Sequence, residues 1–152
     1  MSTAALSAPY AAVLEAVLAR LIPLDELGPG AREAGVMGYV ETALGQWHAH
    51  HLDAYAAGLE ALEQRALDAY GQGFARCDDA QQDALLEQFE RDDAFFDLVR
   101  THAIEGMFGD PRWGGNAGGA GWELLGYPGP REEWTAAEQQ LGTAVDGSSA
   151  PR

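Results

Sequence analysis

The sequence predicts an all-α protein: a small bundle of about five helices, with an ordered glycine- and tryptophan-rich loop appended to it. Apolar residues recur every three or four positions along most of residues 9–107, which is the spacing of one face of a helix. No segment shows the alternation of apolar and polar residues that is typical of a half-buried strand. Six glycines then fall between Gly109 and Gly121, where the interior of neither a helix nor a strand fits.

A chain of 152 residues favours a single domain. We expect this domain to cover residues 1–141 and to include the loop at residues 109–121. After Tyr127 we expect a turn and a last short helix anchored by Trp134. Residues 142–152 are small and polar, so we expect a disordered tail.

The first helix is expected to begin near Pro9, which suits a first helical turn, and to end before Pro23. The second is expected to begin near Pro29. It contains Gly35 and Gly38, which indicate close packing against another helix. Its apolar face comprises Val36, Val40, Leu44 and Trp47.

The third helical pattern is the longest and covers residues 52–74. Asp78 or Asp79 is expected to cap a fourth helix, and Asp92 or Asp93 is expected to cap a fifth.

The charge of the chain excludes several classes of function. The net charge is -15, from 24 acidic and 9 basic residues, and the sequence contains no lysine. Nucleic-acid binding requires cationic groups for the phosphates, and anionic membrane surfaces repel an acidic chain.

No apolar run reaches the length of a membrane-spanning helix. The first residues do not form a signal peptide. We therefore expect a cytoplasmic protein, or a periplasmic one if a signal was removed or the partner exports the complex.

The segment at residues 105–126 is the most unusual part of the chain. Trp113 and Trp122 bracket its glycines, and a flexible linker would not normally carry such large apolar groups. Two interpretations remain open: a rigid turn cluster held by the tryptophans, or a surface that contacts a partner. The residues expected to form the loop or to touch a partner are Phe108, Asp110, Arg112, Trp113, Gly114, Gly115, Asn116 and Trp122.

Two groups of histidines and carboxylates could carry chemistry. On a helix, His48 and His51 could share a metal ion, but the sequence supplies no third ligand because Asp53 lies on a different face. His102 and Glu105 could perform acid–base chemistry, although a helical pair at this spacing is usually structural. We therefore assign no catalytic and no metal-binding residue.

Cys77 and the glycine-rich segment are weaker candidates. The acidic neighbours of Cys77 disfavour a thiolate. The glycines follow a helix, lack a lysine and are preceded by Asp110, so they fit neither a P-loop nor a dinucleotide-binding fingerprint.

A long motif near the C-terminus is shared with a known family. Phe95 and Phe96 precede the segment EGMFGDPRWGGN at residues 105–116, which is followed by GWELLGYP at residues 121–128. These segments resemble the small-subunit family of gluconate 2-dehydrogenase, often called subunit 3. The front half agrees more loosely, through an Ile-Pro pair and the segment PGAREAGV at residues 29–36.

The resemblance implies a non-catalytic accessory subunit. Its partner would be a large FAD-dependent dehydrogenase of the glucose-methanol-choline (GMC) type, which oxidises a sugar or polyol, and some such complexes add a cytochrome subunit. The small subunit would bind no cofactor itself, since FAD is expected in the partner, and it would support folding of that partner. Family members often carry a twin-arginine export signal, which the start of this sequence lacks.

Two other functions compete with this interpretation. The chain could be a helical scaffold that self-associates through its aromatic surface. It could also be an independent metal-dependent enzyme that uses His102 and Glu105.

Overall fold

The computed structural model describes residues 6–92 and 94–130. Its α-helices are α1 (Ala8–Leu21), α2 (Val36–Gly45), α3 (Leu52–Tyr70), α4 (Asp79–Asp92), α5 (Ala94–Phe108) and α6 (Ala120–Leu124). The described residues contain no β-strand, only an isolated β-bridge between Asp25 and Gly28. The predicted all-α fold is therefore confirmed. No described helix is both long and apolar enough to span a membrane.

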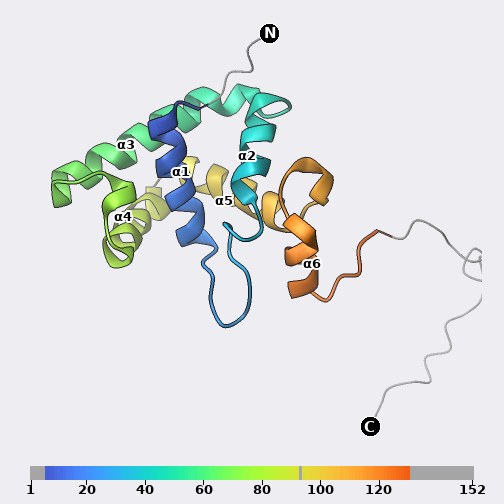
Figure 1. The fold of residues 1–152 in the computed structure, drawn as a ribbon. Helices are drawn as coiled ribbons and strands as arrows, with labels where there is room; N and C mark the ends of the chain where they lie inside the picture. The colour runs from blue at the N-terminus through green and yellow to red at the C-terminus, as the bar shows by residue number, and fades with distance from the viewer. Residues whose placement is uncertain (1–5, 93, 131–152) are drawn as a thin grey trace, which may run out of the picture.

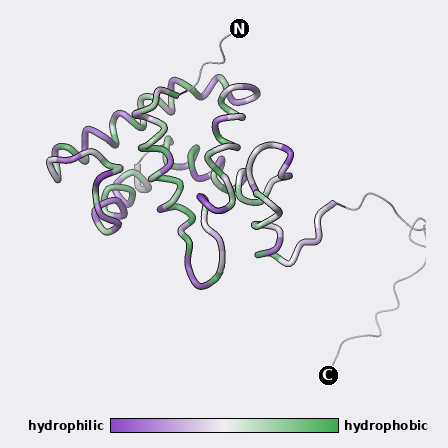
Figure 2. Tube along the Cα trace, viewed as in Figure 1, coloured by the Kyte–Doolittle hydropathy of each residue, from purple (hydrophilic) through white to green (hydrophobic). Residues whose placement is uncertain are grey.

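The core forms around α1, which contacts α2, α3, α4 and α5 (Figure 1). Hydrophobic residues extend along much of α1 (Figure 2), and Leu14, Val17 and Leu18 are almost completely buried. Tyr55 and Leu59 of α3 are fully buried in the same cluster. Close approach between helices depends on small residues. A Cβ on Gly58 of α3, for example, would collide with the ring of Phe95 on α5.

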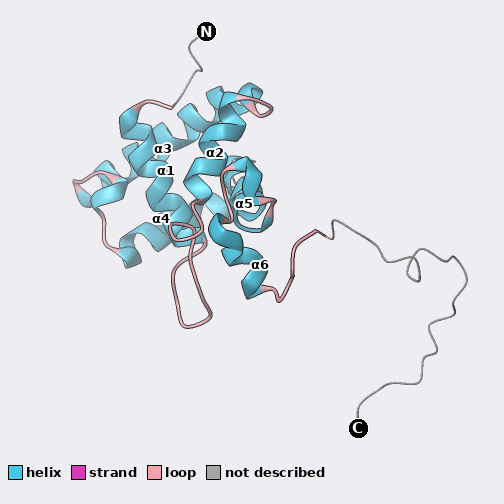
Figure 3. Ribbon diagram, turned by 45° about the vertical axis from the view of Figure 1, so that its right-hand side comes forward, coloured by secondary structure: helices cyan, strands magenta, loops and turns pink. Residues whose placement is uncertain are grey.

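The second helix begins later than the sequence predicts. Residues 22–35 form a long connection whose tip projects from the bundle (Figures 1 and 3), and α2 begins at Val36. Gly35 lies outside the helix as its N-cap, with φ of 65°, a left-handed conformation that glycine adopts at little cost. Trp47 follows the helix and is 39% exposed, so the prediction that it lies on the core face of this helix was wrong.

The boundaries of the third and fourth helices follow local rules. Gly71 ends α3 in a left-handed conformation, and Phe74 lies beyond that helix in the 3₁₀ turn η2 (Phe74–Arg76). Asp78 caps α4: its Oδ1 accepts a hydrogen bond of 2.9 Å from the Gln81 amide, and Gln81 Oε1 accepts one of 3.1 Å from the Asp78 amide. This reciprocal pair is a capping box, which confirms that prediction.

Other predicted features lie elsewhere or outside the described residues. Asp92 is the last residue of α4. Asp93, the short helix around Trp134 and the tail at residues 142–152 fall outside the described residues.

The glycine-rich segment is folded between helices. It contains the 3₁₀ turns η3 (Pro111–Trp113) and η4 (Ala117–Gly119). The predicted loop extended to residue 121, but α6 begins at Ala120. The segment contacts α2 and leads into α6, which packs on α5. It therefore joins two helices of the bundle.

Candidate functional site

Asn116 lies at the centre of the segment between α5 and α6. Its side chain is completely buried, and its φ of 46° is left-handed, a conformation that asparagine tolerates better than most residues. Its Nδ2 donates to the Gly109 carbonyl over 2.8 Å, and its Oδ1 accepts from the Gly121 amide over 2.8 Å. Its own amide donates to the carbonyl of Gly106 in α5 over 2.7 Å. One side chain therefore holds both ends of the segment together.

Glycines allow the segment to approach the backbone of α5. A Cβ on Gly115 would lie 2.2 Å from the carbonyl oxygen of Gly106, and one on Gly121 would lie 1.9 Å from that of Met107. Both distances are far inside van der Waals contact. Gly114 lies next to α2 instead, where a Cβ would be 3.1 Å from the Gly38 carbonyl oxygen. The prediction that Gly38 marks contact between helices was wrong, because it faces this segment.

The remaining loop residues have fixed orientations. Asp110 accepts hydrogen bonds from the Arg112 amide (3.0 Å) and from the Arg112 guanidinium (2.6 Å). The hydrogen bonds from Arg112 lower the pKa of the Asp110 carboxyl. Trp122 Nε1 donates to the carbonyl of Phe108 over 2.7 Å. Trp113 follows Arg112 in η3, and its ring lies 5.9 Å from the Arg112 guanidinium.

Two half-exposed tryptophans, Trp47 and Trp113, and the buried Tyr39 beside them form what we call the aromatic patch. The rings of Trp47 and Trp113 meet edge to face, with centroids 5.4 Å apart, and those of Tyr39 and Trp47 are 6.1 Å apart. The three line a shallow pocket of about 220 Å³. Trp47 and Trp113 are 39% and 48% exposed. The two tryptophans therefore leave apolar surface in contact with water.

A polar cluster lies next to the aromatic patch. The Tyr39 hydroxyl donates to Glu105 Oε2 of α5 over 2.7 Å, and burial together with this carboxylate raises the pKa of Tyr39 to about 12. His48 Nε2 lies 3.5 Å from the same Glu105 oxygen. The ring of His102 stacks on that of His48 at a centroid distance of 4.3 Å.

His102 is the buried member of this cluster, with only 2% of its surface exposed. Its Nδ1 lies 2.8 Å from the hydroxyl of Tyr55, in hydrogen-bond contact. Burial, and then the neighbouring His48, lower the pKa of His102 to about 4. The imidazole is therefore neutral near pH 7.

The structure gathers all four histidines of the chain. His50 and His51 lie in the 3₁₀ turn η1 (Ala49–His51), and the ring centroids of His51 and His102 are 5.6 Å apart. Sequence spacing proposed His48 with His51 and, separately, His102 with Glu105. It could not show that the two pairs meet, because the turn after α2 is brought to α5 only by tertiary packing.

The predicted site residues fall into two groups. Asn116, Gly114 and Gly115 hold the segment in place. Trp113 and the Arg112 side chain face outward, with 67% of the latter exposed. Sequence reasoning missed that Trp47 is half-exposed and that it lines a pocket with Trp113 and the buried Tyr39. The sequence could indicate this only in part, because the spacing of apolar residues does not predict the orientation of an aromatic residue that follows the end of a helix.

Cys77 has no features of a nucleophile. It is buried, and burial is the main cause that raises the pKa of its thiol. It lines a pocket of about 400 Å³ beside Arg20, whose guanidinium contacts Asp83 at 2.6 and 2.7 Å.

The described residues form a small helical protein in which two half-exposed tryptophans lie beside a hydrogen-bonded glycine-rich segment. Residues 8–129 match the family described as Gluconate 2-dehydrogenase subunit 3. The chain belongs to this family, which confirms the resemblance seen in the sequence. A search of curated proteins and a search of solved structures found no match. The family description is that of one subunit of a dehydrogenase.

Proposed function

We propose that this chain is a non-catalytic accessory subunit that binds a large FAD-dependent dehydrogenase of the GMC type and supports its folding. In this proposal the partner carries FAD and oxidises a sugar or polyol. Family membership supports the dehydrogenase complex. The aromatic patch supports the mode of binding, and it is the observation that carries the proposal.

The patch has the composition of an interaction hot spot. Tryptophan, tyrosine and arginine dominate the binding energy of protein interfaces, and Trp113 lies with its ring 5.9 Å from the Arg112 guanidinium. Exposed tryptophans leave apolar area in water that a partner could cover, at roughly 25 cal/mol per Å². The hydrogen bonds of Asn116 and Asp110 keep the backbone beside Trp113 in place, so little ordering entropy would be lost on binding.

The test is a pull-down of the GMC-type dehydrogenase from the same genome, co-expressed with this chain or with its Trp113→Ala variant. We expect the variant to bind at least roughly 30-fold more weakly, the effect of losing a hot-spot residue worth about 2 kcal/mol. We expect its own unfolding free energy to change by less than about 1 kcal/mol, because a half-exposed side chain makes few core contacts.

The matched control is Leu67→Ala. Leu67 is also a large exposed apolar residue, 44% exposed, but it lies near the far end of α3 (Figure 1). This variant should bind like the unchanged chain. If both variants bind normally, the aromatic patch is not the interface. If the dehydrogenase is equally soluble, FAD-loaded and active without this chain, the accessory function is wrong.

A further inference from the structure

The histidines beside the aromatic patch form a cluster that the dehydrogenase function does not explain. His48, His102 and Glu105 each offer one ligand atom, and these three atoms all lie within 4.8 Å of one another. They come from two elements, the turn after α2 and helix α5. A metal ion bound among them would join these elements directly.

The donor set is that of a transition-metal site. Two imidazoles and one carboxylate are a common ligand set for zinc, and they also suit other first-row divalent ions. Magnesium and calcium prefer oxygen ligands. The choice of histidines therefore selects for ions such as Zn²⁺.

The ligands are held by outer-shell hydrogen bonds. Tyr55 contacts His102 Nδ1 at 2.8 Å, which leaves Nε2 as the nitrogen free for an ion. Tyr39 donates to Glu105 Oε2 over 2.7 Å. Partners of this kind orient metal ligands and fix the tautomer of a ligating histidine.

His48 lacks the hydrogen bonds that a structural histidine normally makes. Its Nδ1 is buried and has no hydrogen-bond partner within the part of the chain that the structure describes. Its Nε2 is 3.5 Å from Glu105, which is longer than a good hydrogen bond. No strong interaction therefore holds His48 Nε2, the nitrogen that faces Glu105, and an ion there would supply one.

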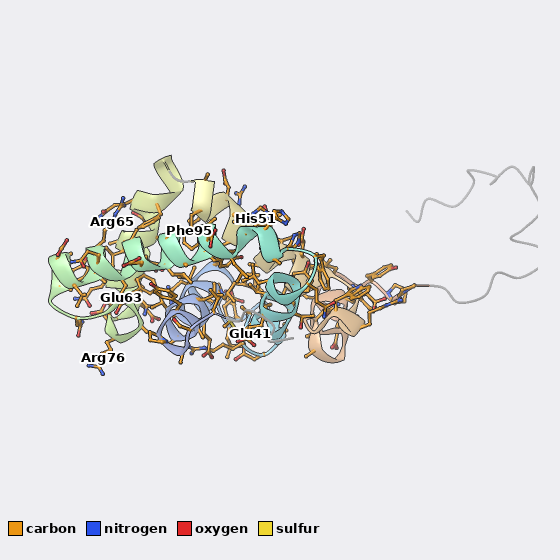
Figure 4. All side chains as sticks on the ribbon, turned by 90° about the horizontal axis from the view of Figure 1, so that it is seen from above. Glu41, His51, Glu63, Arg65, Arg76 and Phe95 are labelled. Atoms are coloured by element: carbon orange, nitrogen blue, oxygen red, sulfur yellow. The ribbon has the colours of Figure 1, made fainter. Side chains whose placement is uncertain are left out.

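A second set of ligands lies on the surface. His48, His50 and His51 also place one ligand atom each within 4.8 Å of the others. His50 is exposed, and no hydrogen bond of His50 or His51 orients either ring among the described contacts. Figure 4 labels His51 at the end of α3 that lies nearer to α2. His51 belongs to this surface set and not to the inner one.

We propose that His48, His102 and Glu105 bind a divalent transition-metal ion of the zinc class, with water completing the coordination. The ion would hold the turn after α2, and with it the adjacent Trp47, against α5. This inference does not depend on the proposed dehydrogenase partner, because the ligands all belong to this chain.

The test is calorimetric titration of Zn²⁺ into the full chain, purified without a polyhistidine tag and freed of metal with a chelator. We expect one ion per chain, a higher melting temperature with Zn²⁺, and no comparable effect of Mg²⁺. Glu105→Gln and His102→Gln should each weaken binding by more than about tenfold, because even outer-shell changes cost roughly 10- to 100-fold. Tyr55→Phe, which removes only the hydroxyl, should weaken it by about tenfold.

His50→Ala is the matched control, since His50 belongs only to the surface set, and it should change the affinity by less than about twofold. Circular dichroism establishes which variants fold. If His102→Gln does not fold, Glu105→Gln and Tyr55→Phe still test the proposal. Glu105 is half-exposed, and the Tyr55 variant loses only a hydroxyl. The proposal is overturned if no saturable binding occurs, or if His50→Ala abolishes binding while Glu105→Gln preserves it. The second result would show simple chelation by surface histidines.

Discussion

At the scale of a single residue, Asn116 holds the glycine-rich segment in place by contacting the chain on both sides of it. Both of its side-chain hydrogen bonds go to backbone groups, Gly109 and Gly121. Without the side chain, the Gly121 amide is left buried with no acceptor. Such a group costs about 1–3 kcal/mol.

We predict that Asn116→Ala destabilises the protein by about 2–4 kcal/mol, since it removes both hydrogen bonds and adds strain at a positive φ. Asn116→Gly relieves the strain but still loses the hydrogen bonds, so it should remain destabilised. Denaturation by urea measures both variants. Gln64→Ala, which removes only an exposed hydrogen bond to Asp68, should stay within about 0.5 kcal/mol. A glycine variant as stable as the unchanged protein would contradict this account.

At the scale of elements, α6 packs directly on α5 at Gly121. No side chain fits between them there, since a Cβ would lie 1.9 Å from the Met107 carbonyl oxygen. Helix α6 is only five residues long and is too short to be stable alone. Its position therefore depends on this contact and on the hydrogen bond from Trp122.

We predict that Gly121→Ala shifts α6 and costs about 3 kcal/mol, at the upper end of overpacking effects. Gly118→Ala is the control: a Cβ there meets nothing within 4 Å, and φ is 64°. Its cost should be about 1 kcal/mol, from backbone strain alone. Thermal unfolding and tryptophan fluorescence compare the two. Equal costs would show that close packing at α6 is not what the glycine provides.

At the scale of the whole molecule, the aromatic patch is small. Its pocket is lined by three side chains, whereas a stable dimer commonly buries about 1,200–2,000 Å². The strongly acidic chain, with a net charge of -15, also repels a second copy of itself. A stable interface of either kind therefore needs surface beyond the patch, and the charge repulsion favours a different protein over self-association.

We therefore predict that the purified chain sediments as a 16.2 kDa monomer across the micromolar range. Sedimentation velocity at several concentrations measures this. A concentration-dependent dimer that is lost in Trp113→Ala would instead favour the self-associating scaffold.

Much of the fold was predictable from local patterns. The spacing of apolar residues gave the helices, Pro9 and Asp78 gave two of their starts, and the motif at residues 105–128 gave the family. These features act over a few residues, so the sequence displays them directly. The start of α2 was mispredicted because Pro29 looks like a helix start, while the chain there is held by contacts with other segments, such as the hydrogen bond from the Ala31 amide to Ile22.

The sequence by itself determined the helical class, the acidic surface and the family, because composition, periodicity and motifs are properties of neighbouring residues. Only the tertiary structure decided which motif residues are buried and which face outward. It also decided that Trp47 meets Trp113 and that His48 meets His102 and Glu105. These pairs are more than fifty residues apart in the sequence. Their contacts arise from how α2 packs on α5, which no local pattern encodes.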